Sequence, residues 1–195
     1  MNADTLSAQL AALPGAVLRA AEHAAVGYDL SVALPESSLI AAVTIMDEAG
    51  YFIEGMTGVD WLGECEALRK EAEAKGQKAA AAANSADADA PKADAARPAP
   101  PAEPLEQGCP PQQDELEVVY DFNLYAARHR VCLRVRTPRA NPLIHTIAEI
   151  YPIAHWHERE IHEFFGIVFI GHPYLIPLLL PEDAEYHPLL KDYSA

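Results

Sequence analysis

The stretch Glu115–Thr137, ELEVVYDFNLYAARHRVCLRVRT, decides the fold of this chain. Its first half places a large apolar residue at every second position: Leu116, Val118, Tyr120 and Phe122. Its second half repeats the alternation with Val131, Leu133 and Val135. A period of two puts such residues on one face of a β-strand. With only a short polar connection between the halves, the sequence predicts a β-hairpin that has one buried face.

The opposite face of this hairpin is charged. Arg130, Arg134 and Arg136 share one strand parity, while Glu117 and Asp121 fall on the outward parity of the preceding strand. Cross-strand pairs of opposite charge would neutralise part of this basic stripe. The pattern therefore leaves two interpretations open, which are pairing within the chain and docking of a partner.

Residues before the hairpin indicate more strands and helices. Val26, Tyr28, Leu30, Val32 and Leu34 alternate as in a strand, and a further strand is expected over Tyr51–Asp60. Between them a helix is predicted to start at residues 35–38, with Leu39, Ile40, Val43 and Met46 at helical spacing and Gly50 as its left-handed cap. Met1–His23 predicts a helix that breaks near Pro14 and Gly15.

The segment 63–114 differs from both flanks. It begins with charged helix-forming residues and continues as AAAANSADADAPKADAARPAPPAEP, which offers little apolar surface beyond methyl groups. We expect a disordered or weakly helical insert that interrupts one sheet. The fold class is then α+β: a two-layer domain with a mixed or antiparallel sheet and helices (1–62 and 115–166), followed by an extended C-terminal arm (167–195).

Composition excludes several classes of function. The formal net charge of −15 argues against a nucleic-acid partner, which would require Lys and Arg to neutralise phosphates. No apolar run is long enough to span a bilayer, and the beginning lacks a secretory pattern, so a cytoplasmic location is expected. The three cysteines are scattered along the sequence, at Cys65, Cys109 and Cys132. Iron–sulfur clusters and structural zinc sites need several thiolates that converge on one point, so free thiols are expected here.

Histidines near the C-terminus raise the question of a metal site. His155, His157 and His162 fall within one predicted helix. A zinc-protease helix needs His at positions i and i+4, but His157 and His162 are five apart and lie roughly 140° apart around the helix. We therefore expect no metal ligand and no catalytic residue here. A free-standing metal-dependent enzyme that uses this His-rich region remains the alternative.

The part of this helix over Glu158–Gly166 carries charged residues with a structural interpretation. Arg159 and Glu163 have the i, i+4 spacing of an ion pair, and acidic groups near a helix start complement its dipole. Ile161, Phe164 and Phe165 form its apolar stripe. No Gly-rich phosphate loop accompanies the helix, so no bound nucleotide cofactor is expected.

A resemblance to a known family covers residues 141–193, which read NPLIHTIAEIYPIAHWHEREIHEFFGIVFIGHPYLIPLLLPEDAEYHPLLKDY. This region resembles the respiratory complex I 30 kDa subunit family, whose bacterial members are the C subunits of NADH-quinone oxidoreductase. The same family includes the homologous subunit of energy-converting membrane-bound nickel–iron hydrogenases. The resemblance covers about fifty residues, and upstream only the pattern of strands and helix agrees. The residues expected to form the family motif or to dock a partner are Trp156, Glu158, Arg159, Glu160, Glu163, Phe165, Gly166, Gly171, His172, Pro173, Leu179, Pro188, Lys191, Asp192 and Tyr193.

This resemblance implies an α+β subunit without cofactors, whose C-terminal segment extends along a large 49 kDa-like or hydrogenase-like subunit. A neighbouring iron–sulfur subunit is the second implied partner. The location implied is peripheral, on the cytoplasmic face of the cell membrane, with membrane association only through the complex. The chain departs from the family pattern at His162 and Glu163, where Tyr-Asp is common, and at Ile176, Pro177 and Leu190, where arginines are usual. Because arginines are lost there, we lean toward a hydrogenase-type or otherwise divergent complex.

Overall fold

The structure is a computed structural model that describes residues 3–63 and 114–194. The predicted disordered or weakly helical insert (63–114) lies, except for its first and last residues, outside the described residues, as do Cys65 and Cys109. Residues 1–62 and 114–195 belong to one compact unit.

Five strands form the main sheet: β1 (Val17–Ala20), β2 (Leu30–Leu34), β3 (Phe52–Asp60), β4 (Glu115–Leu124) and β5 (His129–Pro138). Their order is β1-β2-β5-β4-β3. β2 and β5 run parallel, and the other pairs are antiparallel, so the predicted mixed sheet is confirmed. β4 and β5 form the predicted hairpin, and its connection contains the short 3-10 helix η2 (Tyr125–Ala127).

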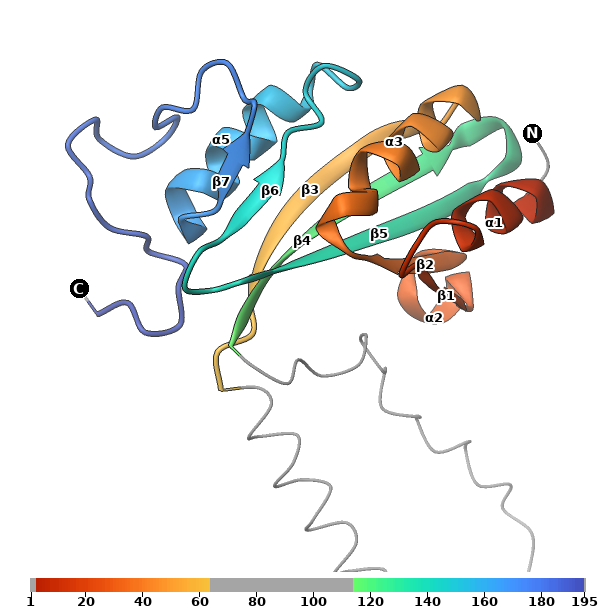
Figure 1. The fold of residues 1–195 in the computed structure, drawn as a ribbon, viewed down its shortest axis with the longest axis horizontal. Coiled ribbons are helices and arrows are strands. Elements are labelled where there is room, and N and C mark those ends of the chain that lie inside the picture. The colour runs from red at the N-terminus through yellow and green to blue at the C-terminus, as the bar shows by residue number, and fades with distance from the viewer. Residues whose placement is uncertain (1–2, 64–113, 195) are drawn as a thin grey trace, which may run out of the picture. The chain divides into compact units, whose positions relative to one another are not determined.

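Three longer helices accompany this sheet: α1 (Ala3–Ala11), α3 (Leu39–Glu48) and α5 (Ala154–Phe165). Figure 1 shows α1 and α3 lying along the sheet and α5 near β3. The shorter elements are α2 (His23–Val26) and the 3-10 helix η1 (Glu36–Ser38). A second, two-stranded parallel sheet pairs β6 (Leu143–His145) with β7 (Val168–Ile170). The α+β class is confirmed.

The core forms where the predicted apolar faces meet. All seven alternating residues of the hairpin are at most 1% exposed, and Leu39, Val43 and Met46 of α3 are fully buried. The same cluster includes Ile144, Ile161 and Ile167, which belong to the C-terminal elements or lie beside them. One hydrophobic core therefore joins the hairpin to α5 and β6. Its burial stabilises the fold in proportion to the apolar area removed from water.

The N-terminal prediction was partly wrong. The strand begins at Leu30 instead of Val26, because residues 23–26 form the short α2, which ends at Gly27 with a φ of 83°. The predicted second half of the N-terminal helix is the strand β1, which pairs with β2. Residues 17–20 form a strand because they hydrogen-bond to the open edge of β2. The local spacing of apolar residues in the sequence carries no information about this tertiary contact.

α5 begins at Ala154, four residues before Glu158, and contains His155, His157 and His162 as predicted. Glu158 therefore lies in its second turn and is fully buried, so it does not complement the start of the helix as expected from the sequence. Its carboxylate accepts hydrogen bonds from the Thr146 hydroxyl (2.5 Å) and the Ile147 N–H (2.8 Å). Burial raises the pKa of Glu158 to about 7, although these two hydrogen bonds act in the opposite direction.

Gly58 of β3 allows α5 to approach the sheet closely. A Cβ atom at this position would lie 2.4 Å from the ring of Phe165. We predict that Gly58→Ala lowers the free energy of unfolding by about 1–3 kcal/mol, because Phe165 must move. Gly55→Ala on the same strand is the control, since a Cβ there meets nothing within 4 Å. Urea denaturation of both variants checks this, and equal losses would contradict the close contact.

Glu158 is expected to make stability depend on pH. Between its unfolded pKa near 4.5 and its folded pKa near 7, the folded state keeps a proton that the unfolded state releases, so stability falls as pH rises through this window. The total loss is about 3 kcal/mol, at about 1.4 kcal/mol per pKa unit. We predict that Glu158→Gln removes this fall, whereas Glu160→Gln on the exposed face of α5 keeps it. Urea titrations at several pH values test the difference, and parallel curves for wild type and Glu158→Gln would disprove it.

Candidate docking surface

The chain after β7 forms an arm, residues 171–194, that contains turns but no helix or strand. Figure 1 shows it leaving β7 and passing around α5 toward the C-terminus. Phe169 lies within the predicted extended arm (167–195), but it is only 2% exposed. It is buried because Val168–Ile170 pairs with β6 and turns the Phe169 ring into the core. The exposed apolar residues of the arm itself therefore begin beyond β7.

Two side chains of α5 bind the backbone of the arm. The Arg159 guanidinium donates to the carbonyl oxygens of Ile176 (2.9 Å) and Pro177 (2.8 Å). The Glu163 carboxylate accepts from the N–H groups of the next three residues, at 2.7 Å for Leu178, 3.0 Å for Leu179 and 3.1 Å for Leu180. We call this arrangement the backbone clamp. It replaces the predicted ion pair between Arg159 and Glu163.

The physical reason for the backbone clamp is the proline content of the arm. Pro173, Pro177 and Pro181 prevent a continuous helix or strand, so the backbone groups between them need other partners. Three converging N–H groups form a concave site that favours an anion, and hydrogen bonds to a charged carboxylate are stronger than neutral ones. Glu163 is 4% exposed and meets that requirement.

The later part of the arm completes the C-terminal end of α5. The helix ends at Gly166, which has a φ of 75°. The carbonyl oxygen of Glu163 accepts from Nδ1 of His187 (2.8 Å), and that of Phe164 accepts from the Leu189 N–H (3.2 Å). These contacts satisfy carbonyls that a helix end leaves open. A Cβ on Gly166 would lie 2.8 Å from the His187 ring, so glycine is required there.

The end of the arm is fastened to the main sheet through Asp60, which is 5% exposed at the end of β3. Its Oδ2 accepts from the Lys191 N–H (2.9 Å) and from Arg139 (3.3 Å). Arg139 also binds Asp192 with both Nη atoms, one of them at 3.0 Å, and this contact lowers the pKa of Asp192. The Lys-Asp-Tyr part of the family motif thus binds within the chain through Lys191 and Asp192.

The outward side of the arm and α5 is apolar and aromatic. Leu179 is 65% exposed, Tyr174 60% and Trp156 56%. The Arg159 guanidinium lies 5.6 Å from the Trp156 ring centre and 5.5 Å from that of Tyr174, within the range of cation–π attraction. Exposed apolar patches of this kind mark interaction sites on soluble domains.

The remaining motif residues divide between exposed and partly covered positions. Glu160, Gly171, Pro173 and Tyr193 are exposed, whereas Phe165, Gly166, His172 and Pro188 are partly buried. Of these, Phe165 meets β3 and Gly166 meets His187, so both position α5 and the arm. The structure therefore separates residues that hold the surface together from those that could contact another protein.

His155 and His172 meet, a contact that the sequence spacing did not predict. Nδ1 of His172 accepts the Tyr174 N–H (3.1 Å), so its proton is assigned to Nε2, which donates to Nδ1 of His155 (3.2 Å). The two facing nitrogens then share one hydrogen bond. Across residues 3–63 and 114–194, no three His, Cys, Asp or Glu side chains come together as a metal site.

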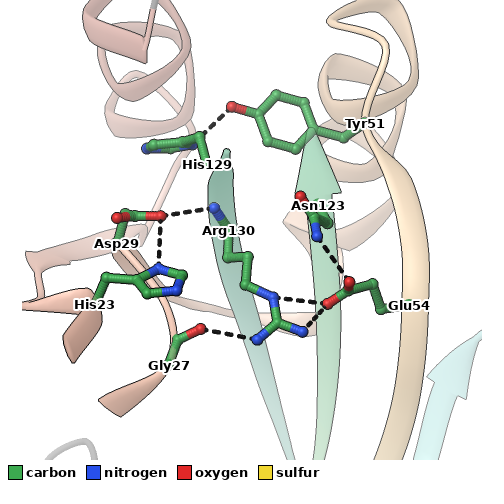
Figure 2. A network of polar contacts seen from close by, with 8 residues as sticks. All are labelled: His23, Gly27, Asp29, Tyr51, Glu54, Asn123, His129 and Arg130. Carbon is green, nitrogen blue, oxygen red and sulfur yellow. Dashed lines mark hydrogen bonds and ion pairs between the residues drawn. The ribbon is translucent and has the colours of Figure 1, made fainter. Parts of the chain in front are cut away.

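The basic stripe of β5 is paired within the chain. Figure 2 shows Arg130 reaching Glu54 and the Gly27 carbonyl, while its N–H donates to Asp29 (2.7 Å). Asp29 is also bound by His23, and Glu54 is bound by Asn123, whose hydrogen bond helps to lower the pKa of Glu54. These contacts tie α2, β3, β4 and β5 together.

The other two arginines of the stripe share one carboxylate. Glu117 is 2% exposed. Its Oε1 lies 3.2 Å from Nε of Arg136, and its Oε2 lies 3.8 Å from Nη1 of Arg134. Trp61 donates its indole N–H to the same carboxylate at 3.0 Å. Pairing within the chain is therefore the interpretation that the structure supports. On the same face, burial raises the pKa of the Cys132 thiol to about 11, which disfavours a reactive thiolate.

Among the described residues, no helix is both long and apolar enough to cross a membrane. This finding covers α1, α3 and α5, whose lengths are 9, 10 and 12 residues.

Comparisons with known proteins agree with the resemblance seen in the C-terminal region. The profile of the respiratory-chain NADH dehydrogenase 30 kDa subunit matches residues 32–195. The C subunit of NADH-quinone oxidoreductase from Roseiflexus sp. is 31% identical over 98% of this chain and 83% of its own length. That of Roseiflexus castenholzii is 48% identical, but the match covers 42% of this chain and 47% of the relative, so about half of that relative is spanned. The C subunit of an F(420)H(2) dehydrogenase from Methanosarcina mazei is 46% identical over 43% of this chain and 54% of its own length.

Two solved structures share the fold. A trypsin-resistant fragment of Nqo5 aligns with a TM-score of 0.57 and 20% identity, covering 90% of this chain and all of that one. A chain of the membrane-bound sulfane sulfur reductase, an archaeal respiratory membrane complex, aligns with a TM-score of 0.63 and 19% identity, covering 98% and 84%. At these identities the likeness concerns the fold alone. The profile match and the relative that spans nearly the whole chain together show that this chain belongs to the 30 kDa subunit family of the respiratory-chain NADH dehydrogenase.

Proposed function

We propose that this chain is a cofactor-free structural and assembly subunit of a membrane-associated, energy-converting redox complex. It docks on the large 49 kDa-like or hydrogenase-large-like subunit and lies beside an iron–sulfur subunit. Family membership supports the role of a redox-complex subunit, and relatives are named as subunits of NADH-quinone oxidoreductase and F(420)H(2) dehydrogenase. Attachment to the cytoplasmic face of the membrane then comes through the complex.

The observation that carries the docking proposal is the uneven distribution of exposed apolar residues. Fifteen large hydrophobic residues are exposed in the described part of the chain, and eleven of them lie between Leu143 and Tyr193. Those from α5 and the arm are Trp156, Tyr174, Ile176, Leu179, Tyr186, Leu189 and Tyr193. Such a concentration is unfavourable in water and fits a surface that another protein covers.

Departures from the usual family pattern bear on the type of complex. Leu190 packs partly against the hydrophobic core, and Ile176 is 37% exposed. An arginine at either position would present charge-assisted donors to a partner, which aliphatic side chains cannot do. We therefore propose a hydrogenase-type or otherwise divergent complex ahead of the usual NADH:quinone oxidoreductase.

The alternative of a free-standing metal-dependent enzyme would use the His155–His172 pair, which no third His, Cys, Asp or Glu joins among the described residues. We predict that the chain, purified without oxygen, is colourless and contains no stoichiometric metal. Elemental analysis by plasma mass spectrometry and a visible spectrum check this. Stoichiometric zinc or iron that is lost in His172→Ala would favour the enzyme instead.

Leu179 is the residue of choice for testing docking, because its N–H is held by Glu163 while its side chain is 65% exposed. We predict that Leu179→Asp lowers recovery of the co-expressed large subunit in a pull-down by about tenfold or more, since a charge would enter a desolvated contact. Tyr125→Asp is the control, because Tyr125 is 84% exposed on the hairpin connection.

Circular dichroism should show the same fold for the wild type and both variants, because both side chains face solvent. Equal recovery of the large subunit by wild type and by folded Leu179→Asp would contradict docking through the arm. A loss with Tyr125→Asp alone would move the docking site to the hairpin end of the domain.

A further inference from the structure

We infer that Arg159 and Glu163 preform the arm within the chain itself, so that a partner meets a strip of side chains instead of open backbone. The strip consists of Trp156, Tyr174 and Leu179, and it fits an apolar partner surface edged by carboxylates. This inference rests on the proposed docking function for its partner, but the preformed arm can be tested on the chain alone.

The first step concerns which backbone groups remain available. Addition of a partner strand requires residues whose N–H and C=O can both bond to the new strand. Within 177–180 none offers both, because Pro177 lacks an N–H and the N–H groups of Leu178, Leu179 and Leu180 are bound to Glu163. The carbonyl of Pro177 is held by Arg159 as well. Strand addition is therefore blocked along this part of the arm, and recognition falls to side chains.

The second step concerns what those side chains present. Leu179 points outward while its N–H is bound, so the backbone clamp fixes the direction of its side chain. Arg159 stacks against both Trp156 and Tyr174, which holds the two exposed rings against one cation. Aromatic residues and arginine supply most of the affinity at protein interfaces, and ordering them before binding lowers the entropic penalty of association.

The third step concerns charge. The chain has a net charge of −15, yet no Asp or Glu occurs between Glu163 and Glu182. The carboxylate of Glu163 is buried under the arm, and the half-buried cation Arg159 lies beside the strip. On the arm side of the strip no acidic residue occurs before Glu182, whereas on α5 the exposed Glu160 stands four positions after Trp156. A partner surface with carboxylates at its margin would complement this strip, whereas a basic margin would be repelled.

Hydrogen exchange of the purified full-length chain tests the preformed arm. We expect the amides of Leu178, Leu179 and Leu180 to be protected in the wild type and to exchange at least about tenfold faster in Glu163→Gln, because a neutral amide binds three N–H groups less well. Glu160→Gln, on the same helix but exposed, should leave their protection unchanged. Exchange of these amides at the rate of an unstructured peptide in the wild type would overturn the inference.

Binding of the co-expressed large subunit tests the partner surface. We expect Glu163→Gln to weaken binding by about tenfold, and Trp156→Glu to weaken it about tenfold more than Trp156→Lys. Equal losses for the two Trp156 variants would overturn the carboxylate margin. Protected amides together with no binding by the wild type would instead contradict the proposed function and leave the preformed arm standing.

Discussion

A chain segment interrupted by prolines cannot form all of the hydrogen bonds that its own backbone groups need. This constraint explains how the arm is held in the C-terminal third of the molecule. The arm contains Pro173, Pro177, Pro181 and Pro188, so it has no ladder or helix in which to place its N–H and C=O groups. Arg159 and Glu163 supply partners for both kinds of group from one face of α5. The position of the arm therefore depends on the position of α5.

α5 is fixed in turn by features of the main domain. Gly58 leaves room for Phe165 against β3, and Glu158 bonds to the turn after β6. At the far end of the arm, Asp60 of β3 accepts the Lys191 N–H. The stability of a common α+β core thus holds in place an irregular segment that has an apolar outer side. A fold of this kind says little about function by itself, and the proposed docking role rests on the arm.

Much of the main sheet could be predicted from the sequence, because its signal is local. Leu116, Val118, Tyr120 and Phe122 alternate on one strand, and that period alone identifies a half-buried strand. The three-residue strands β6 and β7 were missed, since three residues are too few to show a period.

The partners of Arg159 and Glu163 were predicted wrongly for a different reason. Their i, i+4 spacing is satisfied equally by a mutual ion pair and by two separate contacts to a distant segment. Only the folded chain shows that the unpaired backbone at 176–180 competes for both side chains. The His155–His172 contact likewise joins residues that no helical spacing relates.

The most direct measurement is hydroxyl-radical footprinting of Trp156, Tyr174 and Leu179 in the isolated chain and in the purified complex, with Tyr125 as reference. The account predicts that all three side chains react readily in the isolated chain and are protected in the complex, while Tyr125 reacts in both. Equal reactivity of the three side chains in both states would contradict a docking surface formed by α5 and the arm.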